Sequence, residues 1–264
     1  MLFDLNAWIG SWPFRSMWDN TAPAMLERMD RHGINWAAVS SLEAIFHRNG
    51  QPANEKLAED VAPYSRRLFP LATINPSYVK WEDDLKYCHE KLNMKGVRLV
   101  PQYQGWELKS AMAVKAVQAC TERGLLICIP HRLEDPRQAH PIDPGRTVEY
   151  DDVVYLLRAV PAAKIVLQNI RVTPAINALL QPDLIDKEWY VDLALTEVHF
   201  NQATLSFLDK VGGKHLVFGT HSPHSYAGSA LVKLELLPVA GDEKADVCYR
   251  HAARLLNVNL METE

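Results

Sequence analysis

The stretch LVFGTHSPHS, residues 216–225, follows an apolar run with two histidines three positions apart. Imidazole binds metal ions and also gains or loses a proton near neutral pH. The two histidines, His221 and His224, therefore allow three interpretations. They belong to a metal site, to a proton-transfer site, or to a turn that merely contains histidine. The place of this stretch in the fold decides among the three.

A second group of reactive side chains lies in HRLEDPRQAHPIDPGRTVEYDD, residues 131–152, which lacks periodicity over its length. Loops this long are usually functional or disordered, and three prolines favour a shaped loop. Glu134 is the preferred carboxylate, because Asp135 precedes a proline and suits a turn. The loop combines groups for proton transfer with groups for anion binding: Arg132, Glu134, Asp135, Arg137 and His140. The alternative is that these alternating charges only solvate the loop.

Arg98 lies inside the apolar run GVRLV. A buried guanidinium requires an anionic partner. That partner is either the carboxylate or phosphate of a substrate or a structural partner, for which Glu134, Asp135 and Asp192 are the candidates.

Aromatic residues gather on the first loop, WIGSWPFRSMW, and on PQYQGW after Arg98. They indicate the wall of a binding site or, alternatively, an oligomer interface. Tyr103 is the member of this group that could contact a substrate through its hydroxyl.

Eight apolar, β-rich runs must position these residues. They alternate with helical patterns at 81–92 (WEDDLKYCHEKL), 108–123, 150–160, 202–211 and 243–256. Near-continuous apolar runs are typical of parallel strands covered on both faces. We expect a single (β/α)8 TIM-barrel domain over residues 1–264, with the active site at the carboxyl ends of the strands. A doubly wound sheet is the alternative, but no GxGxxG follows the first strand. The expected strands are 2–8, 34–40, 68–74, 96–100, 125–130, 164–169, 189–194 and 215–219.

The composition limits the partners. The chain has 264 residues, 48% hydrophobic and 23% charged, with a net charge of -4 and a pI near 6.2. These values are typical of a soluble globular protein and provide no basic field for nucleic acid. We expect a cytoplasmic protein without signal peptide or membrane anchor, because the N-terminus has no basic region and carries polar residues within its apolar run. The four cysteines form no CxxC pair and are expected to be reduced core thiols.

The order of FDLNAWIG, INPSYVKWEDDL, GVRLVP, IVLQNI, FGTHSPH and HAARLL resembles the amidohydrolase-related metal-dependent hydrolases. That group includes small aromatic-acid decarboxylases and lactonases. The resemblance spans nearly the whole chain and implies a TIM barrel. It also implies a metal held by two histidines of strand one, histidines of strands five and six, and an aspartate of strand eight. The matching positions here are Asn6, Trp8, Pro130, Asn169 and His221.

These replacements argue against the family's metal. An indole offers no lone pair, and an amide oxygen is a poor zinc ligand beside imidazole. His131 lies one residue after Pro130, and such a step along a strand reverses the side chain's face. We therefore expect no metal cofactor. The alternative is one divalent metal such as zinc, with His221 as the central ligand and His131 and His224 as helpers.

The leading hypothesis is a hydrolase of the amidohydrolase type that acts on a small polar or anionic molecule by acid–base chemistry. The alternatives are a metal-dependent hydrolase or decarboxylase with rearranged ligands, and an inactive barrel that serves in binding or assembly. A small molecule is the expected partner, with neither nucleic acid nor membrane, and self-association through the aromatic first loop is a further expectation. The predicted catalytic residues are His221, Glu134 and Asn169. The predicted substrate-binding residues are Arg98, Arg132, Tyr103, Asn6, His131, His140 and His224.

Overall fold

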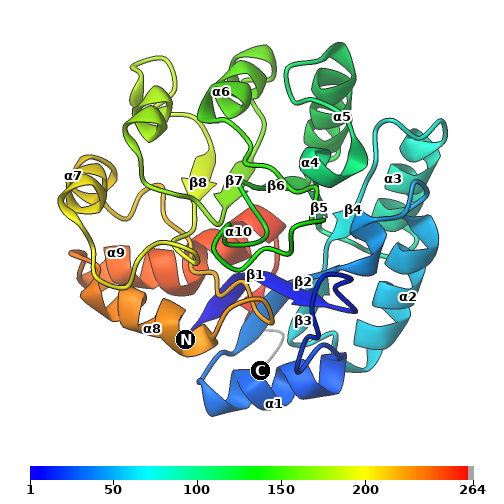
Figure 1. Ribbon diagram of the computed structural model, residues 1–264, viewed down its shortest axis with the longest axis horizontal. Helices are drawn as coiled ribbons and strands as arrows, with labels where there is room; N and C mark the ends of the chain where they lie inside the picture. Colours follow the sequence, from blue (N-terminus) through cyan, green and yellow to red (C-terminus); the bar gives the residue numbers. More distant parts are fainter. Residues whose placement is uncertain (261–264) are drawn as a thin grey trace.

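Parallel strands ringed by helices form a barrel (Figure 1). A computed structural model describes residues 1–260. One sheet has the order β1-β2-β3 and the other β4-β5-β6-β7-β8. Residue 71 separates β3 from β4, so the expected strand 68–74 forms in two pieces. The strands are β1 (Phe3–Ile9), β2 (Trp36–Ser41), β3 (Leu68–Pro70), β4 (Ala72–Thr73), β5 (Gly96–Arg98), β6 (Leu126–Pro130), β7 (Ile165–Gln168) and β8 (Trp189–Val191).

The expected strand 215–219 closes the barrel without forming a regular strand. Val217 N donates to Val191 O of β8 at 3.0 Å, and Leu5 N of β1 donates to Phe218 O at 3.0 Å. Farther along, Trp8 N donates to Ser222 O at 2.9 Å. The segment after residue 214 therefore bridges β8 to β1 through isolated bridges. The (β/α)8 barrel predicted from the sequence is confirmed, whereas the expectation of a regular strand at 215–219 is wrong.

Helices cover the outside of the barrel (Figure 1). The expected helical segments 81–92, 108–123, 150–160 and 202–211 each contain one helix, but 243–256 is divided into α9, a π-helical turn at Asp246–Arg250, and α10. The helices are α1 (Ala22–Arg31), α2 (Gln51–Val61), α3 (Trp81–Glu90), α4 (Pro101–Gln104), α5 (Ala111–Glu122), α6 (Tyr150–Ala159), α7 (Gln202–Val211), α8 (Ala227–Leu236), α9 (Gly241–Ala245) and α10 (His251–Leu256).

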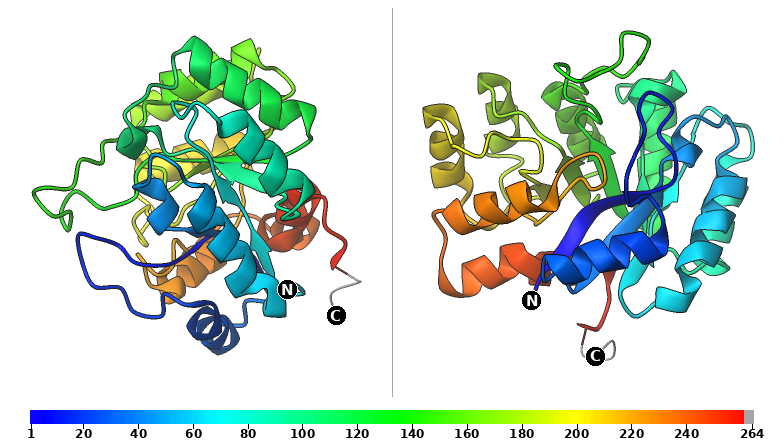
Figure 2. Two further views of the ribbon diagram at one scale, coloured as in Figure 1. Left: turned by 90° about the vertical axis from the view of Figure 1, so that its right-hand side faces the viewer. Right: turned by 60° about the horizontal axis from the view of Figure 1, so that its bottom comes forward.

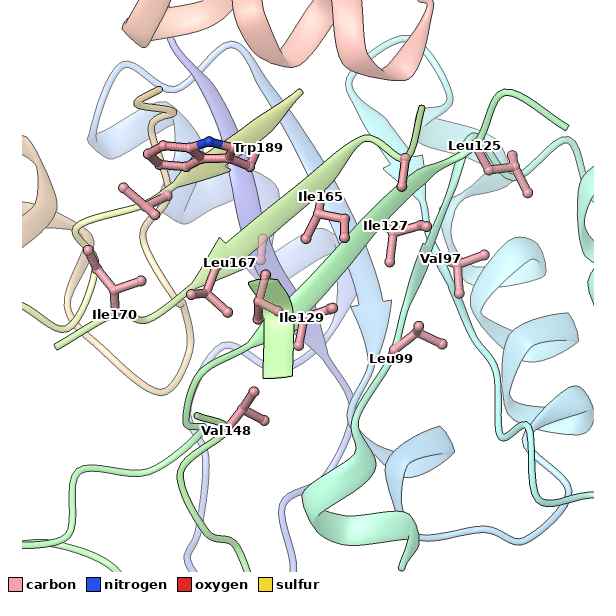
Figure 3. Close-up of a cluster of buried hydrophobic side chains, with 14 of the residues drawn as sticks. Val97, Leu99, Leu125, Ile127, Ile129, Val148, Ile165, Leu167, Ile170 and Trp189 are labelled. Atoms are coloured by element: carbon pink, nitrogen blue, oxygen red, sulfur yellow. The ribbon is translucent and has the colours of Figure 1, made fainter. Parts of the chain in front are cut away.

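Alternation along the strands separates two apolar layers. Ile127 and Ile129 of β6 pack with Ile165 and Leu167 of β7 in the layer beneath the outer helices (Figure 3). The intervening side chains belong to a second cluster inside the barrel, which α10 closes at the amino-terminal ends of the strands: Phe3, Leu5, Trp36, Leu126, Cys128, Val166, Val217, Leu255 and Leu256.

Two long loops project from the same side of the molecule (Figure 2). They are the first loop, residues 10–20, which follows β1, and the long loop, residues 131–149, which follows β6. Both leave the carboxyl ends of their strands, where barrel active sites form. Within residues 1–260, no helix is both long and apolar enough to cross a membrane.

Candidate functional site

A fully buried polar layer lies across the barrel where β1, β7 and β8 end. Asn6 Nδ2 donates to Asn169 Oδ1 and to Asp192 Oδ2, each at 2.8 Å. Asn169 Nδ2 donates to Arg132 O at 2.8 Å and lies 3.1 Å from His221 Nδ1. Asp192 Oδ1 also accepts from Asn169 N at 2.8 Å. The structure thus brings Asn6, Asn169 and His221 together, as the sequence predicted, but in a closed hydrogen-bond network.

Backbone conformation turns two of these side chains toward each other. Asn169 and His221 both have φ of 57°, in the left-handed region that residues with a Cβ adopt reluctantly. Each stands at a carboxyl-terminal strand end, and His221 N donates to Asn6 O at 2.8 Å. Backbone strain at two residues that lie side by side in space is typical of a functional site.

His221 connects the polar layer to the long loop. Its Nε2 lies 2.6 Å from Leu133 O. A carbonyl can only accept, so Nε2 carries the proton and Nδ1 accepts from Asn169. Burial lowers the pKa of His221 to about 3, which keeps the ring neutral. Both nitrogens of this side chain are therefore engaged, and the geometry favours a positioning role.

Arg98 is fully buried inside the barrel. Its Nη1 donates to Ala7 O at 3.1 Å, and its guanidinium lies 3.9 Å from the centroid of the Trp8 ring. The pairs considered for Arg98 with Glu134 and Asp135 do not form, and Asp192 acts on it only through longer-range electrostatic attraction. Arg98 thus stabilises the first strand from within the barrel.

Glu134, Arg15 and His224 form the reactive group above the network. Arg15 Nε donates to Glu134 Oε1 at 2.9 Å, and Arg15 Nη2 donates to His224 O at 2.9 Å. His224 Nε2 lies 4.0 Å from Glu134 Oε1. Burial raises the pKa of Glu134 above its usual value, and Arg15 opposes part of this rise.

His224 is the unusual member of this group. Its side chain is 1% exposed, and neither ring nitrogen has a hydrogen-bond partner among residues 1–260. The ring stacks on His221 with centroids 4.7 Å apart and packs edge-on against Trp12 at 4.7 Å. Burial and the neighbouring positive charges lower the pKa of His224 well below its usual range. A buried imidazole with two unpaired nitrogens is a costly feature for a purely structural residue.

The long loop and the barrel rim enclose a cavity of about 290 Å³ beside Glu134. This volume is near the lower end for small-molecule sites. Four predicted site residues line it, together with Asp143 and Arg146: Tyr103, Arg132, Glu134 and His140. The sequence-based grouping of loop charges is thus divided: Arg132, Glu134 and His140 line this cavity, whereas Asp135 and Arg137 pair with each other and line a different one. We call the cavity beside Glu134 the loop cavity.

His131 lies apart from the loop cavity. Its Nδ1 is 2.7 Å from Val148 O, its ring stacks on Tyr150 at 4.7 Å, and burial lowers its pKa to about 4. Val148 N in turn donates to His131 O at 2.8 Å. His131 therefore closes the base of the long loop, in agreement with the reversal of face expected one residue after Pro130.

Aromatic side chains close the first loop over His224. Trp12 packs edge-on against Phe14, Phe46 and Tyr103 at centroid distances of 5.5, 5.1 and 5.6 Å. Trp18 on the same loop is 84% exposed. Trp12 belongs to a buried apolar cluster, of which Tyr103 also lines the loop cavity. The wall of a binding site and an oligomer interface both stay predictions.

Comparison with known proteins places this arrangement in a family. The family model described as Amidohydrolase matches residues 12–258. The chain belongs to the amidohydrolase family. No protein with a curated description matches its sequence significantly.

Solved structures of amidohydrolase folds resemble the whole chain. The 5-carboxyvanillate decarboxylase from Sphingomonas paucimobilis has 15% identity and a TM-score of 0.72, with 98% of this chain and 99% of that chain covered. A dihydroxybenzoic acid decarboxylase from Polaromonas sp. JS666, solved with manganese and 2-nitroresorcinol, has 16% identity, coverage of 97% and 96%, and a TM-score of 0.72. A probable 2-pyrone-4,6-dicarboxylic acid hydrolase from Acinetobacter baumannii, solved with citric acid, has 14% identity, coverage of 97% and 99%, and a TM-score of 0.67. At these identities the likeness shows the fold.

The residues at the family's metal positions do not fit a metal in this amidohydrolase. Asn6 Oδ1 accepts from Trp8 Nε1 at 3.2 Å, and Asn169 Oδ1 accepts from Asn6. Both nitrogens of His221 are engaged as well. Each of these amide oxygens and imidazole nitrogens thus already has a partner within the protein. Among residues 1–260, no group of three His, Cys, Asp or Glu side chains converges in a metal-binding arrangement.

Sequence reasoning missed two contributors to the site. Arg15 follows the aromatic run WPF without any pattern that marks it, and Arg146 follows a proline and a glycine in the long loop. One signal was available for Arg15, because the first loop and the long loop must share the carboxyl end of the barrel.

Proposed function

We propose that this amidohydrolase is a metal-independent hydrolase that acts on a small anionic molecule in the loop cavity. The observation that carries the proposal is Glu134, a carboxylate of raised pKa that lines the loop cavity and lies 4.0 Å from the unpaired imidazole of His224. Carboxyl groups with raised pKa values can accept and return protons near neutral pH.

The place of each residue in or beside the loop cavity indicates its role in the proposed reaction. Glu134 accepts a proton from water as the water oxygen bonds to the substrate's carbonyl carbon. The bond from that carbon to the leaving group then breaks, and Glu134 returns the proton to the leaving group. The neutral imidazole of His224 accepts a hydrogen bond from the protonated Glu134 carboxyl, a contact that tightens from 4.0 Å when substrate binds. Arg132 and Arg146 line the same cavity and are placed to attract an anionic substrate. Tyr103 and His140 orient it.

The buried residues act indirectly in this proposal. His221 holds Leu133 O, the carbonyl next to Glu134, while Asn169 holds the carbonyl of Arg132. Two consecutive backbone groups of the long loop are thereby fixed to the barrel. His221, Asn169 and Asn6 therefore determine where Glu134 lies.

Decarboxylation of a small aromatic acid is a second candidate. Its supporting observation is the aromatic side of the site, where His140 stacks on Phe14 with centroids 6.5 Å apart and Tyr103 packs on Trp12. Here Glu134 would protonate the ring carbon that bears the carboxylate, after which the bond to the carboxyl carbon breaks and CO2 leaves. Two of the similar structures described above carry decarboxylase names.

A substrate screen in chelator tests the proposal. Protein dialysed against EDTA is incubated with small carboxylate-bearing esters, lactones and amides, and with hydroxybenzoates, while acid and CO2 release are recorded. We expect turnover that E134Q lowers by about a hundredfold or more, because general acid–base groups contribute on this scale. E149Q, an exposed carboxylate at the end of the long loop, is the matched control and should retain full activity. Turnover that EDTA abolishes, or that E134Q retains, would contradict the proposal.

A further inference from the structure

A second cavity of about 390 Å³ lies on the other side of Arg132 from the loop cavity. Segments that follow β6, β7 and β8 form it together with the first turn of α7. Its lining includes three arginines and several hydroxyl or amide groups: Arg132, Arg137, Arg171, Thr173, Thr196, Asn201 and Thr204. Asp135 and Glu197 are its carboxylates. We call it the arginine cavity.

Two of the three arginines have no carboxylate partner. Asp135 is committed to Arg137, whose Nη2 lies 2.7 Å from Oδ2. Arg132 is 9% exposed, donates Nη2 to Leu195 O at 2.8 Å, and leaves Nε without an acceptor among residues 1–260. In the described part of the chain, the Arg171 guanidinium forms no ion pair. Arg171 is exposed, so the cost of a buried guanidinium without a counterion falls on Arg132, and an anion in the cavity removes it.

A further cation lies beneath the same turn. Lys233 is 2% exposed and donates Nζ to Leu193 O at 2.9 Å, Ala194 O at 2.5 Å and Thr196 O at 3.0 Å. The residues 193–196 thus lie between two buried cations, Lys233 on one side and Arg132 on the other. Among residues 1–260, the hydrogen bonds of both charged groups go to backbone carbonyls. The local excess of positive charge is therefore a property of the fold.

The first turn of α7 adds to this field. Asn201 and Thr204 both line the arginine cavity, and Asn201 Oδ1 accepts from Thr204 N at 3.0 Å as the helix cap. Helix amino termini carry partial positive charge and commonly bind anions. The exposed Glu197 offsets only one of the positive charges around the cavity.

We propose that the arginine cavity binds the oxyanion group of a small molecule, a phosphate or a carboxylate, between Arg132 and Arg171. Arg132 approaches from the barrel side, Arg171 from the segment after β7, and the first turn of α7 completes the site. This binding site lies outside the loop cavity, with which it shares Arg132, and its occupation requires no step of the reaction proposed there. Arg132 separates the two cavities, since it lines both.

Calorimetric titration at constant ionic strength tests the proposal. The probes are inorganic phosphate, phenyl phosphate and succinate, and the variants are R171Q and, as a matched control, R66Q. Arg66 is an exposed arginine away from both cavities. We expect saturable binding that R171Q weakens by about tenfold, the loss typical of one charge-assisted contact. R66Q should bind like the wild type.

Each outcome bears on the inference. Binding of the phosphate probes alone identifies a phosphoryl site, and binding of succinate alone identifies a carboxylate site. Absence of saturable binding with all three probes would overturn the proposal, as would equal affinities of R171Q and R66Q. E134Q should bind the probes like the wild type, so a failure of Glu134 in catalysis is distinguishable from a failure of this site.

Discussion

Glu134 experiences two opposing influences that determine its proton affinity. Burial disfavours the charged carboxylate and raises the pKa, whereas the Arg15 guanidinium at 2.9 Å favours the charged form. The proton affinity of Glu134 therefore depends on the first loop, which carries Arg15. Closure of that loop and ionisation of Glu134 are coupled.

Replacement of Arg15 by alanine should move the acid limb of the activity profile to higher pH. Without Arg15 the pKa of Glu134 rises further, so the carboxylate that accepts a proton appears only at higher pH. The measurement is the rate against pH for a substrate from the screen. R48A, an exposed arginine that follows β2, is the control. An acid limb at the same pH in R15A and wild type would show that Glu134 does not control it.

The sequence predicted which side chains could carry chemistry, but it predicted less well which residues those side chains contact. Glu134 was predicted because a carboxylate, an imidazole and guanidinium groups share one loop. His224 was predicted as a substrate-binding residue, yet it lies buried against Trp12. Burial depends on how the first loop folds over the barrel, which no local pattern encodes.

Residues at the carboxyl ends of the barrel strands hold the site in place through hydrogen bonds. Asn169 follows β7 and uses its side chain for three hydrogen bonds, to Asn6, Arg132 and His221. Its left-handed backbone directs the amide into the barrel. A single residue thus joins three elements to the long loop.

Replacement of Asn169 by alanine should lower the free energy of unfolding by about 3 kcal/mol beyond any backbone strain, since each buried hydrogen bond contributes about 1 kcal/mol. N93A provides the matched control. Asn93 has φ of 53° but is exposed, so its replacement should report the strain alone, about 1 kcal/mol. Denaturant unfolding measures both. Equal losses in N169A and N93A would mean that the network contributes no stability.

The elements were largely predictable because apolar runs mark buried parallel strands. The last expected strand, 215–219, did not form regularly: its apolar run 216–218 is kept, but the segment from Leu216 to Ser222 pairs with β8 and β1 only at isolated bridges. Helix 81–92 appeared as expected, with Trp81, Leu85 and Cys88 buried on one face.

Across the whole molecule the barrel axis passes through three layers. Apolar side chains fill the amino-terminal half, the hydrogen-bonded layer of Asn6, Asn169 and His221 lies above them, and an aromatic layer with Trp8 and Trp12 covers it. The polar side chains that replace the family's metal ligands therefore satisfy one another's hydrogen bonds, since Asn6, Asn169 and His221 each have partners within the protein. The sequence showed that the ligands had changed, but only the structure shows that their replacements bind one another.

Titration of the protein with zinc and with manganese, followed by elemental analysis after dialysis, tests this account most directly. Protein purified without chelator should retain far less than one metal ion per chain. N6H, which restores one family ligand position, should not by itself produce a tight site, because Asn169 and His221 remain engaged with other groups. Retention of close to one zinc or manganese per wild-type chain would contradict the account, since it would mean that the network at Asn6, Asn169 and His221 opens to coordinate metal.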